Sequence, residues 1–407
     1  MSDTLKPETP EQLRDAVAWA VAEEQPLAVV GRGSKHGLGR PMQTAHDLDL
    51  SGLSGILSYE PEELVLTARA GTPLAEIQAA LAERRQCLAF EPPDWAPLWD
   101  GAAGEGSLGG LLACNLAGPR RIKAGAARDH FLGFSAVTGR GELFKAGGKV
   151  VKNVTGYDLP KLIAGSYGTL AVMSEVTVKV LPAPEKTRTV LILGLDDARA
   201  AAALSEALGS PHEVSAAAHL PARVAALSEV GYVRNAGGPV TAVRLEGPPS
   251  SVAWRCEHLR GQLGSFGPTE ELHSMNSARL WREVADMAVF ADRPAAAVWR
   301  VSVAPTAGPA VAAAACRADD LYYFDWGGGL LLIAMADLTA DRAERLRAAV
   351  AASGGGHATL LRASPEQRGS LPPFEPPGAA KERLTRRIKD AFDPRGVLNP
   401  GRLYAFC

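Results

Sequence analysis

The chain has 407 residues, of which 46% are hydrophobic and 22% are charged, and its formal net charge is -2. This length favours two domains, and the near-neutral charge argues against a nucleic-acid-binding protein. The five cysteines are scattered, so no iron–sulfur or zinc site is expected, and the pattern is typical of a reducing compartment. Because no signal pattern and no bilayer-spanning apolar run are present, we expect a cytoplasmic protein, which a partner can still hold at the inner face of the membrane.

The first 182 residues predict alternating helices and strands. Thr9 caps a first helix, in which Pro10 takes the first position and Gln12 completes a capping box. Apolar spacing and turn residues predict the elements that follow. In chain order these are strands at 26–30 and 64–68, a helix that begins at 72–74, strands at 134–137 and 143–145, an extended stretch at 149–154, a short helix at 158–164 and a strand at 170–181.

After the linker at 182–184 the pattern changes to β-α-β units in series. Its segments are strand 189–193, helix 196–208, strand 240–245, helix 250–263 and strands 299–303, 330–334 and 358–361. Such units predict a ferredoxin-like sheet with helices on one face. A proline- and glycine-rich stretch at 364–378 indicates a linker, and a basic helix at 381–392 and a compact tail follow it.

A glycine-rich loop, Gly31-Arg32-Gly33-Ser34-Lys35-His36-Gly37-Leu38-Gly39, follows the strand at 26–30. It fails as a Rossmann fingerprint, because His36 stands at the third glycine position and no helix is predicted after it. Glycines let backbone N–H groups surround an anion, and Ser34 and Lys35 add a hydroxyl and a cation. Alone, the loop is equally consistent with a tight surface turn. Further glycine clusters at 104–110, 118–121 and 125–129 favour an extended, doubly phosphorylated ligand.

These loops resemble those of the FAD-binding domain in the vanillyl-alcohol oxidase / p-cresol methylhydroxylase (PCMH-type) family. The diphosphate loop of that family resembles 31–39, its second phosphate-facing loop resembles 107–110, and its Gly-x-x-x-Asp block resembles 125–129. The stretches 147–159 and 165–170 and the tail 392–402 resemble the glycolate oxidase branch, and 354–361 resembles its E-type subunit. The resemblance covers nearly the whole chain.

The resemblance implies an α+β protein with a two-part FAD-binding domain at 1–184, a ferredoxin-like α/β cap domain at 185–378, and a C-terminal segment at 379–407 that returns to the FAD-binding domain. It implies non-covalent FAD, because Ser34 stands where covalent-flavin members carry a histidine. The implied cofactor-binding residues are Arg32, Gly33, Ser34, Lys35, His36, Gly37, Ser107, Gly109, Gly110, Asn115, Gly118, Gly125 and Val172. The implied partners are a D-type FAD catalytic subunit and an F-type Fe–S subunit, and the substrate of the complex is a small 2-hydroxy acid.

The sequence predicts no catalytic residue and no metal site. Oxidation of a 2-hydroxy acid needs a base and a cation for the carboxylate, whereas the eight histidines form no recognisable motif. We interpret His212 and His219 as surface residues, His36 as a partly solvated loop residue and His130 as structural. His357 is the one histidine that we would test for substrate contact.

Arginines give a second set of candidates. One predicted helix carries Arg279, Trp281 and Arg282, whose arginines could bind a substrate carboxylate, although a solvated helix face is the simpler explanation of these residues. The tail arginines Arg395 and Arg402 are expected to fix the returning segment. We expect partners to bind the cap domain, where Trp254, Trp281 and Trp299 are candidate exposed residues, although a place in the core suits Trp299 better.

Three functions remain open on the sequence. The chain is an FAD-binding subunit of a glycolate oxidase complex that supports oxidation of glycolate to glyoxylate and electron transfer, a self-sufficient FAD-dependent hydroxy-acid dehydrogenase, or a flavin-free scaffold subunit. The missing histidine motif argues against the second, and the intact phosphate loops argue against the third.

Overall fold

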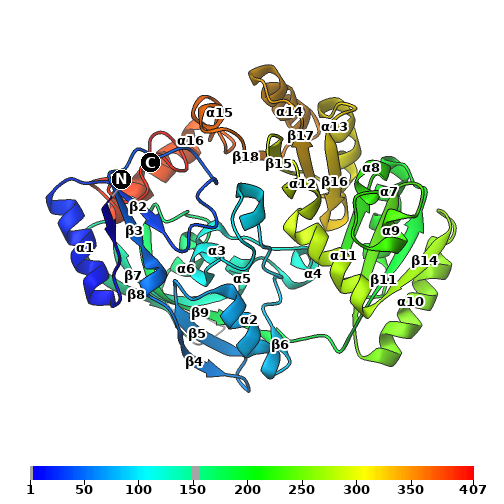
Figure 1. Ribbon diagram of the computed structural model, residues 1–407, viewed down its shortest axis with the longest axis horizontal. Helices are drawn as coiled ribbons and strands as arrows, with labels where there is room; N and C mark the ends of the chain where they lie inside the picture. The colour runs from blue at the N-terminus through cyan, green and yellow to red at the C-terminus, as the bar shows by residue number, and fades with distance from the viewer. Residues whose placement is uncertain (1–2, 149–155) are drawn as a thin grey trace. The chain divides into compact units, whose positions relative to one another are not determined.

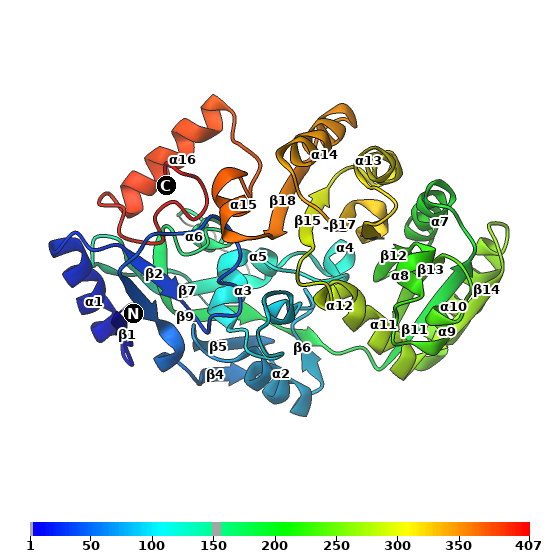
Figure 2. The same cartoon turned by 45° about the horizontal axis from the view of Figure 1, so that its top comes forward.

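The computed structural model describes residues 3–148 and 156–407 and divides the chain into two compact units (Figures 1 and 2). Unit 1 comprises Met1–Ala117, Gly125–Ala183 and Pro372–Cys407, and unit 2 comprises Gly118–Ala124 and Pro184–Leu371. The predicted extended stretch at 149–154 lies outside the described residues. The segment 118–124 groups with unit 2, although its glycine and arginines had suggested a loop of the FAD-binding domain.

Unit 1 is built around two sheets. The strands β1 (Asp3–Leu5), β3 (His46–Asp49) and β2 (Leu27–Val30) form a parallel sheet in that order. The second sheet is antiparallel, with the order β4 (Ile56–Glu60), β5 (Val65–Arg69), β9 (Ala171–Lys179), β7 (Phe131–Thr138) and β8 (Leu143–Gly147). A short ladder pairs β6 (Gln86–Cys87) with β10 (Leu181–Pro182). This arrangement confirms the two-part fold that the resemblance implies.

The helices of unit 1 follow from local signals in the sequence. Helix α1 (Pro10–Ala22) begins after Thr9, whose hydroxyl accepts a hydrogen bond from the Gln12 N–H at 3.2 Å. Its buried face packs over β2 and β3 in a core that also contains Val397 and Leu398 of the C-terminal segment. The other helices are α2 (Leu74–Glu83), α3 (Leu108–Cys114), α5 (Ala127–His130), α6 (Leu159–Ile163) and α16 (Ala379–Phe392), with 3₁₀ turns at Leu50–Gly52 and Ala96–Trp99.

The C-terminal segment returns to unit 1 and extends the edge of β2. Leu27 N–H donates to the Val397 carbonyl at 2.8 Å, and Asn399 N–H donates to the Leu27 carbonyl at 3.0 Å. The buried Lys389 ammonium donates to the carbonyls of Thr169 and Leu398 and to the Asp393 carboxylate. The segment begins at Pro372, and the stretch before it, predicted as a linker, contains the short helix α15 (Pro365–Ser370).

Unit 2 contains two ferredoxin-like repeats joined in one sheet of order β14-β11-β13-β12-β16-β17-β15-β18. The first repeat is β11 (Lys186–Leu193), α7 (Asp197–Gly209), β12 (Ala216–Leu220), β13 (Val240–Gly247), α10 (Pro249–Leu263) and β14 (Thr269–His273). The second is β15 (Ala297–Ser302), α13 (Gly308–Ala315), β16 (Leu321–Asp325), β17 (Leu330–Met335), α14 (Ala340–Ala352) and β18 (His357–Arg362). Linking helices are α4 (Arg121–Ala124), α8 (Ala222–Ala225), α9 (Gly231–Arg234), α11 (Ser274–Asp286) and α12 (Ala288–Ala291), with 3₁₀ turns at Pro305–Ala307 and Trp326–Gly328.

Helices cover both faces of the first repeat's sheet. Val190 and Ile192 pack with α7 and α10, as the ferredoxin-like prediction requires. Thr189, which points to the opposite face because side chains alternate along a strand, accepts a hydrogen bond from Trp281 Nε1 of α11 at 2.8 Å. The prediction that Trp281 is exposed is therefore wrong, because it is a core residue with 1% exposure. Trp299 is also in the core, at 0%, and Trp254 is 55% exposed.

The prediction that His212 and His219 lie on the surface is wrong, because both are buried. The alanines between them form the central strand β12, whose small side chains allow close packing against the neighbouring strands. His219 lies where the two repeats meet, paired with Phe324 of β16. Its Nδ1 lies 2.9 Å from Thr241 Oγ1, and its Nε2 lies 3.2 Å from Asp197, which also accepts from Tyr322 Oη.

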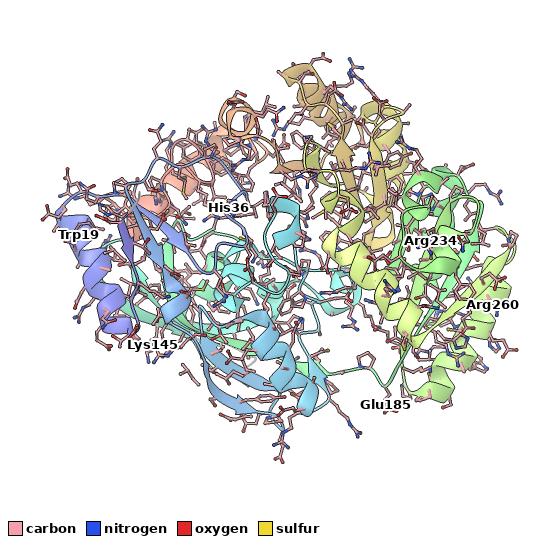
Figure 3. All side chains as sticks on the ribbon, viewed as in Figure 1. Trp19, His36, Lys145, Glu185, Arg234 and Arg260 are labelled. Carbon is pink, nitrogen blue, oxygen red and sulfur yellow. The ribbon has the colours of Figure 1, made fainter. Side chains whose placement is uncertain are left out.

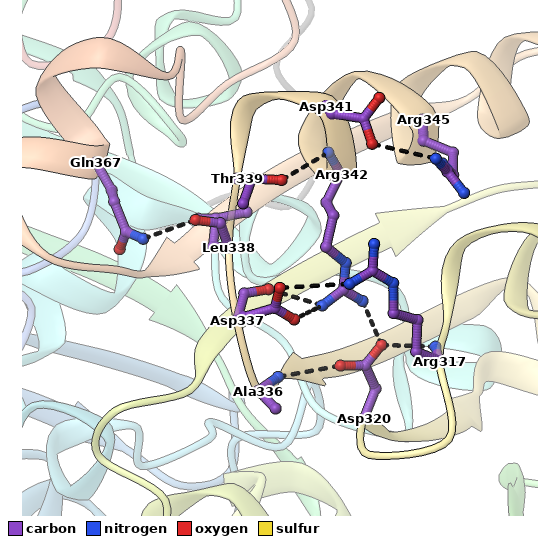
Figure 4. Close-up of polar contacts among 10 residues, drawn as sticks. All are labelled: Arg317, Asp320, Ala336, Asp337, Leu338, Thr339, Asp341, Arg342, Arg345 and Gln367. Atoms are coloured by element: carbon purple, nitrogen blue, oxygen red, sulfur yellow. Dashed lines mark hydrogen bonds and ion pairs between the residues drawn. The ribbon is translucent and has the colours of Figure 1, made fainter.

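A buried ion cluster fixes the second repeat (Figure 4). The guanidinium of Arg342 on α14 contacts the carboxylates of Asp320 and Asp337, and the side chains of Arg342 and Asp320 are 2% and 1% exposed. Asp320 also accepts from the backbone N–H of Arg317 at 2.7 Å and of Ala336 at 3.0 Å. The cluster therefore joins the loop before β16, the end of β17 and the start of α14.

We predict that Asp320→Ala destabilises the protein by about 3–5 kcal/mol, because it leaves a buried guanidinium without its main partner. Asp341→Ala is the matched control, since its pair with Arg345 is exposed and contributes within about 0.5 kcal/mol (Figure 4). Denaturant unfolding of both variants measures the difference. Equal unfolding free energies for the two variants would contradict the assignment of Asp320 to the core.

Candidate functional site

The glycine-rich loop at 31–39 runs directly from the end of β2. It folds into consecutive turns, with the His36 N–H donating to the Gly33 carbonyl and the Leu38 N–H donating to the Lys35 carbonyl, both at 3.1 Å. No helix follows, as the sequence predicts. Gly33 has a φ of +75°, and a Cβ there would meet nothing within 4 Å, so this position needs glycine for its conformation and borders open space.

The second glycine loop lies against the first. A Cβ on Gly31 would lie 2.5 Å from Ser107 Oγ, so this glycine lets the Ser107 side chain approach the first loop. A Cβ on Gly109 would lie 2.7 Å from the Ala70 carbonyl oxygen, so that glycine permits close approach of backbone. Ser107 caps α3 by accepting from the Gly110 N–H at 3.2 Å. The hydroxyl of the buried Thr72 accepts from the Gly55 N–H at 3.0 Å, which fixes the backbone just before α2.

Lys35 is the charged centre of this arrangement. Its Nζ donates to Ser34 Oγ at 3.0 Å and lies 3.5 Å and 3.9 Å from where Cβ atoms on Gly106 and Gly110 would stand. In the described part of the chain, no carboxylate lies within ion-pair distance of it. Burial lowers the pKa of the Lys35 ammonium, against opposing influences of Cys114 and Asp94. A cation withdrawn from water without an ion-pair partner makes this a site for an anion.

The C-terminal segment fixes the carbonyl side of the same loop. Arg402, which is 9% exposed, donates from Nη2 to the Lys35 carbonyl at 3.1 Å and from Nε to the Leu38 carbonyl at 3.4 Å. In return, the Arg40 N–H donates to the Arg402 carbonyl at 2.9 Å. Arg395 instead forms an exposed ion pair with Glu24. Arg402 therefore holds the returning segment, as expected, and also shapes the loop, whereas the exposed pair of Arg395 contributes little to holding it.

The structure brings Ser34, Lys35, Ser107, Gly109 and Gly110 together and separates other predicted residues from them. Arg32 is exposed, as is His36 (labelled in Figure 3), whose Nδ1 lies 2.9 Å from the Gly33 carbonyl oxygen. A Cβ on Gly37 would lie 2.2 Å from the Trp99 ring, so this glycine serves packing.

The remaining predicted residues have structural surroundings. Asn115 ends α3 with a φ of +49°, and its Oδ1 accepts from the Arg128 N–H at 3.0 Å. Gly125 has a φ of +87° beside Asp129, which caps α5. The side chain of Val172 is buried in the α1 core rather than directed at the loops. Gly118 belongs to unit 2, where its carbonyl accepts from Trp326 Nε1 at 3.2 Å.

The other sequence candidates do not form a substrate site. Arg279 is in an exposed ion pair with Glu229, and Arg282 pairs with Asp286 on the same helix. His130 is buried against Phe90, and His357 is exposed at the start of β18. Among the helices that the structure describes, none has the length and apolar character for crossing a membrane.

The loops fit a diphosphate, such as that of FAD, because glycine backbone, two hydroxyls and one cation converge at their junction. We predict that Lys35→Met weakens FAD binding about tenfold or more, since it removes the cation. The FAD-free variant should unfold at a temperature equal to or above that of the unmodified FAD-free chain. Flavin titration and thermal unfolding measure the two effects, and Arg32→Met, on the exposed side of the loop, is the control with a smaller effect.

Arg402→Gln should also weaken FAD binding, by about tenfold, because two loop carbonyls lose a charged donor. Arg395→Gln should leave the FAD dissociation constant unchanged, since its only partner in the described residues is the exposed Glu24. Equal dissociation constants for these two variants would show that the tail does not shape the diphosphate loop.

Comparison with known proteins agrees with this site. The model of the "FAD binding domain" family matches residues 3–147. The glycolate oxidase subunit GlcE of Escherichia coli K12 is 35% identical over 97% of this chain and 97% of its own length. The glycolate oxidase subunit GlcD of Bacillus subtilis 168 is 32% identical over 42% of this chain and 36% of its own.

Solved structures support the fold alone. Substrate-bound p-cresol methylhydroxylase aligns with 98% of this chain and 88% of its own, with a TM-score of 0.70 at 14% identity. Because the likeness to GlcE extends over nearly the whole of both sequences, the relationship is not limited to the nucleotide-binding part. The chain therefore belongs to the GlcE family of FAD-linked oxidoreductase subunits, and its cofactor is FAD.

Proposed function

We propose that this chain is the FAD-binding subunit of a glycolate oxidase complex, in which it supports oxidation of glycolate to glyoxylate. Its partners are a D-type FAD catalytic subunit and an F-type Fe–S subunit, and it supports electron transfer with them. The full-length similarity to a GlcE subunit supports the proposal. The observation that carries it is the partly buried Lys35 ammonium between two glycine loops, with Ser34 and Ser107 beside it.

Within this role, the loops bind FAD without a covalent bond. Lys35 balances the diphosphate charge, the Ser34 hydroxyl lies beside it, and Arg402 keeps the carbonyls of the first loop turned away from the anion. Ser34 offers no ring nitrogen for a flavin bond, and His36 directs its Nδ1 to the Gly33 carbonyl. When bound, FAD supplies the two-electron redox chemistry, and the chain supplies its position.

An accessory role is favoured over a self-sufficient dehydrogenase. Of the described histidines, His130, His212 and His219 are buried and His357 is exposed at a strand end, and the arginine candidates are engaged in ion pairs. A base and a carboxylate-binding cation are therefore expected from the D-type subunit. We place the complex in the cytoplasm, with any membrane attachment made through partners.

The test compares the chain alone with the chain co-expressed with D-type and F-type subunits. Alone, it should carry FAD that acid releases into solution, and it should reduce dye with glycolate poorly. With both partners, it should co-purify and glycolate-dependent dye reduction should appear. Flavin that stays with the precipitated protein would contradict non-covalent binding. Strong glycolate oxidation by the chain alone would support the self-sufficient dehydrogenase instead, and a colourless chain would support the scaffold.

A further inference from the structure

The path of residues 118–124 is not explained by the fold of either unit alone. The chain passes between the two units at four points, and two of these points enclose this seven-residue segment. It leaves unit 1 after α3, which carries the second phosphate loop, and returns at Gly125. The segment, which we call the tether, therefore interrupts the phosphate-binding part of unit 1 with a piece of unit 2.

One charged pair attaches the tether to β13. Arg120 Nε and Nη2 donate to the two carboxylate oxygens of Glu246 at 2.9 Å and 2.7 Å, and the two side chains are 20% and 10% exposed. The Glu246 carboxylate also accepts from Thr187 Oγ1 at 3.2 Å and lies 3.6 Å from Arg244 Nε. Burial would raise the pKa of Glu246, but Arg244 and Arg120 outweigh it and lower that pKa to about 2.

Other contacts hold the rest of the tether. Trp326, at a φ of +52°, donates from Nε1 to the Gly118 carbonyl, and the Arg121 guanidinium lies 4.7 Å from the centre of its ring. Such a backbone conformation is costly for a bulky residue and persists only where the surroundings enforce it. Ile122 packs against the core of the first repeat. The side chain of Lys123, by contrast, pairs with Glu213 where both side chains are exposed.

The base of the tether is closed within unit 1. Asn115 Oδ1 accepts from the Arg128 N–H at 3.0 Å, which joins the residues before and after the tether. Asn115 and Gly125 both have positive φ, and the Ala126 N–H donates to Asp129 at 2.8 Å. The backbone on either side of the tether is therefore bent sharply.

We propose that the tether positions the α3–α5 backbone of unit 1 for FAD binding, with Arg120 as the positioning residue and Glu246 as its anchor. The inference rests on the FAD site of the proposed function. Unit 2 thereby helps to retain the cofactor by holding the tether through hydrogen bonds, and not by contacting the flavin. Loosening Arg120 should make the turns at Asn115 and Gly125 more mobile and the cofactor easier to lose.

The test uses the full-length chain with Arg120→Met, Glu246→Gln and the double variant. Each should release FAD about tenfold faster than the unmodified chain, the usual size of coupling between sites. The double variant should be no faster than Arg120→Met alone, because the pair acts as a unit. Hydrogen exchange should rise in the described amides at 115–117 and 125–129, a local change that general destabilisation does not produce.

Lys123→Gln is the matched control on the same segment, because its pair is exposed and contributes little. It should leave FAD release and hydrogen exchange unchanged. If Arg120→Met lowers the melting temperature but keeps the FAD release rate and the exchange of these amides, the tether is only structural and the inference is overturned. An unmodified chain that binds no FAD would instead refute the proposed function, so the two failures are distinguishable.

Discussion

A positive charge held partly out of water, on Lys35, is the constraint around which unit 1 is organised. In the described residues its Nζ donates to the Ser34 hydroxyl, which does not neutralise the charge. Such a charge is unfavourable in the free protein and becomes favourable when an anion arrives. The two glycine loops meet at this point because Gly31 lets the Ser107 side chain approach to a distance that a Cβ would prevent.

Distant parts of the chain maintain this arrangement. The C-terminal segment pairs with β2 and, through Arg402, fixes the carbonyls of the diphosphate loop, so residues at opposite ends of the sequence form one site. The proposed tether likewise fixes the backbone between α3 and α5, because its Arg120 is paired with Glu246 of unit 2. In both cases an arginine fork supplies directional hydrogen bonds, which lysine would not reproduce. Binding strength in this account therefore depends on residues that do not contact the ligand.

The sequence predicted those features that have local causes. Thr9 and Gln12 mark the start of α1, and the spacing of Leu74, Ile77 and Leu81 marks α2, because capping and helical periodicity are encoded within a few residues. The glycine loop was recognised by composition, and His36 at the third glycine position correctly excluded a helix after it. The ferredoxin-like alternation was visible for the same reason.

What the sequence did not predict depends on long-range pairing. The alanines of β12 carry no strand signal, so burial of His219 follows only from its place at the centre of the sheet. Nothing in the local pattern links Arg120 to Glu246, which are 126 residues apart, or Arg402 to Lys35. The resemblance implied Val172 as a cofactor-binding residue, yet its side chain packs in the α1 core.

The most direct test of the central claim is the pKa of the Lys35 ammonium, measured by NMR titration of isotope-labelled lysine with and without FAD. A Lys35→Met spectrum assigns the resonance. The structure predicts a pKa below the ordinary lysine value in the FAD-free protein, because burial disfavours the charge, and an increase on FAD binding, because the diphosphate stabilises it. An ordinary pKa that FAD leaves unchanged would contradict the account.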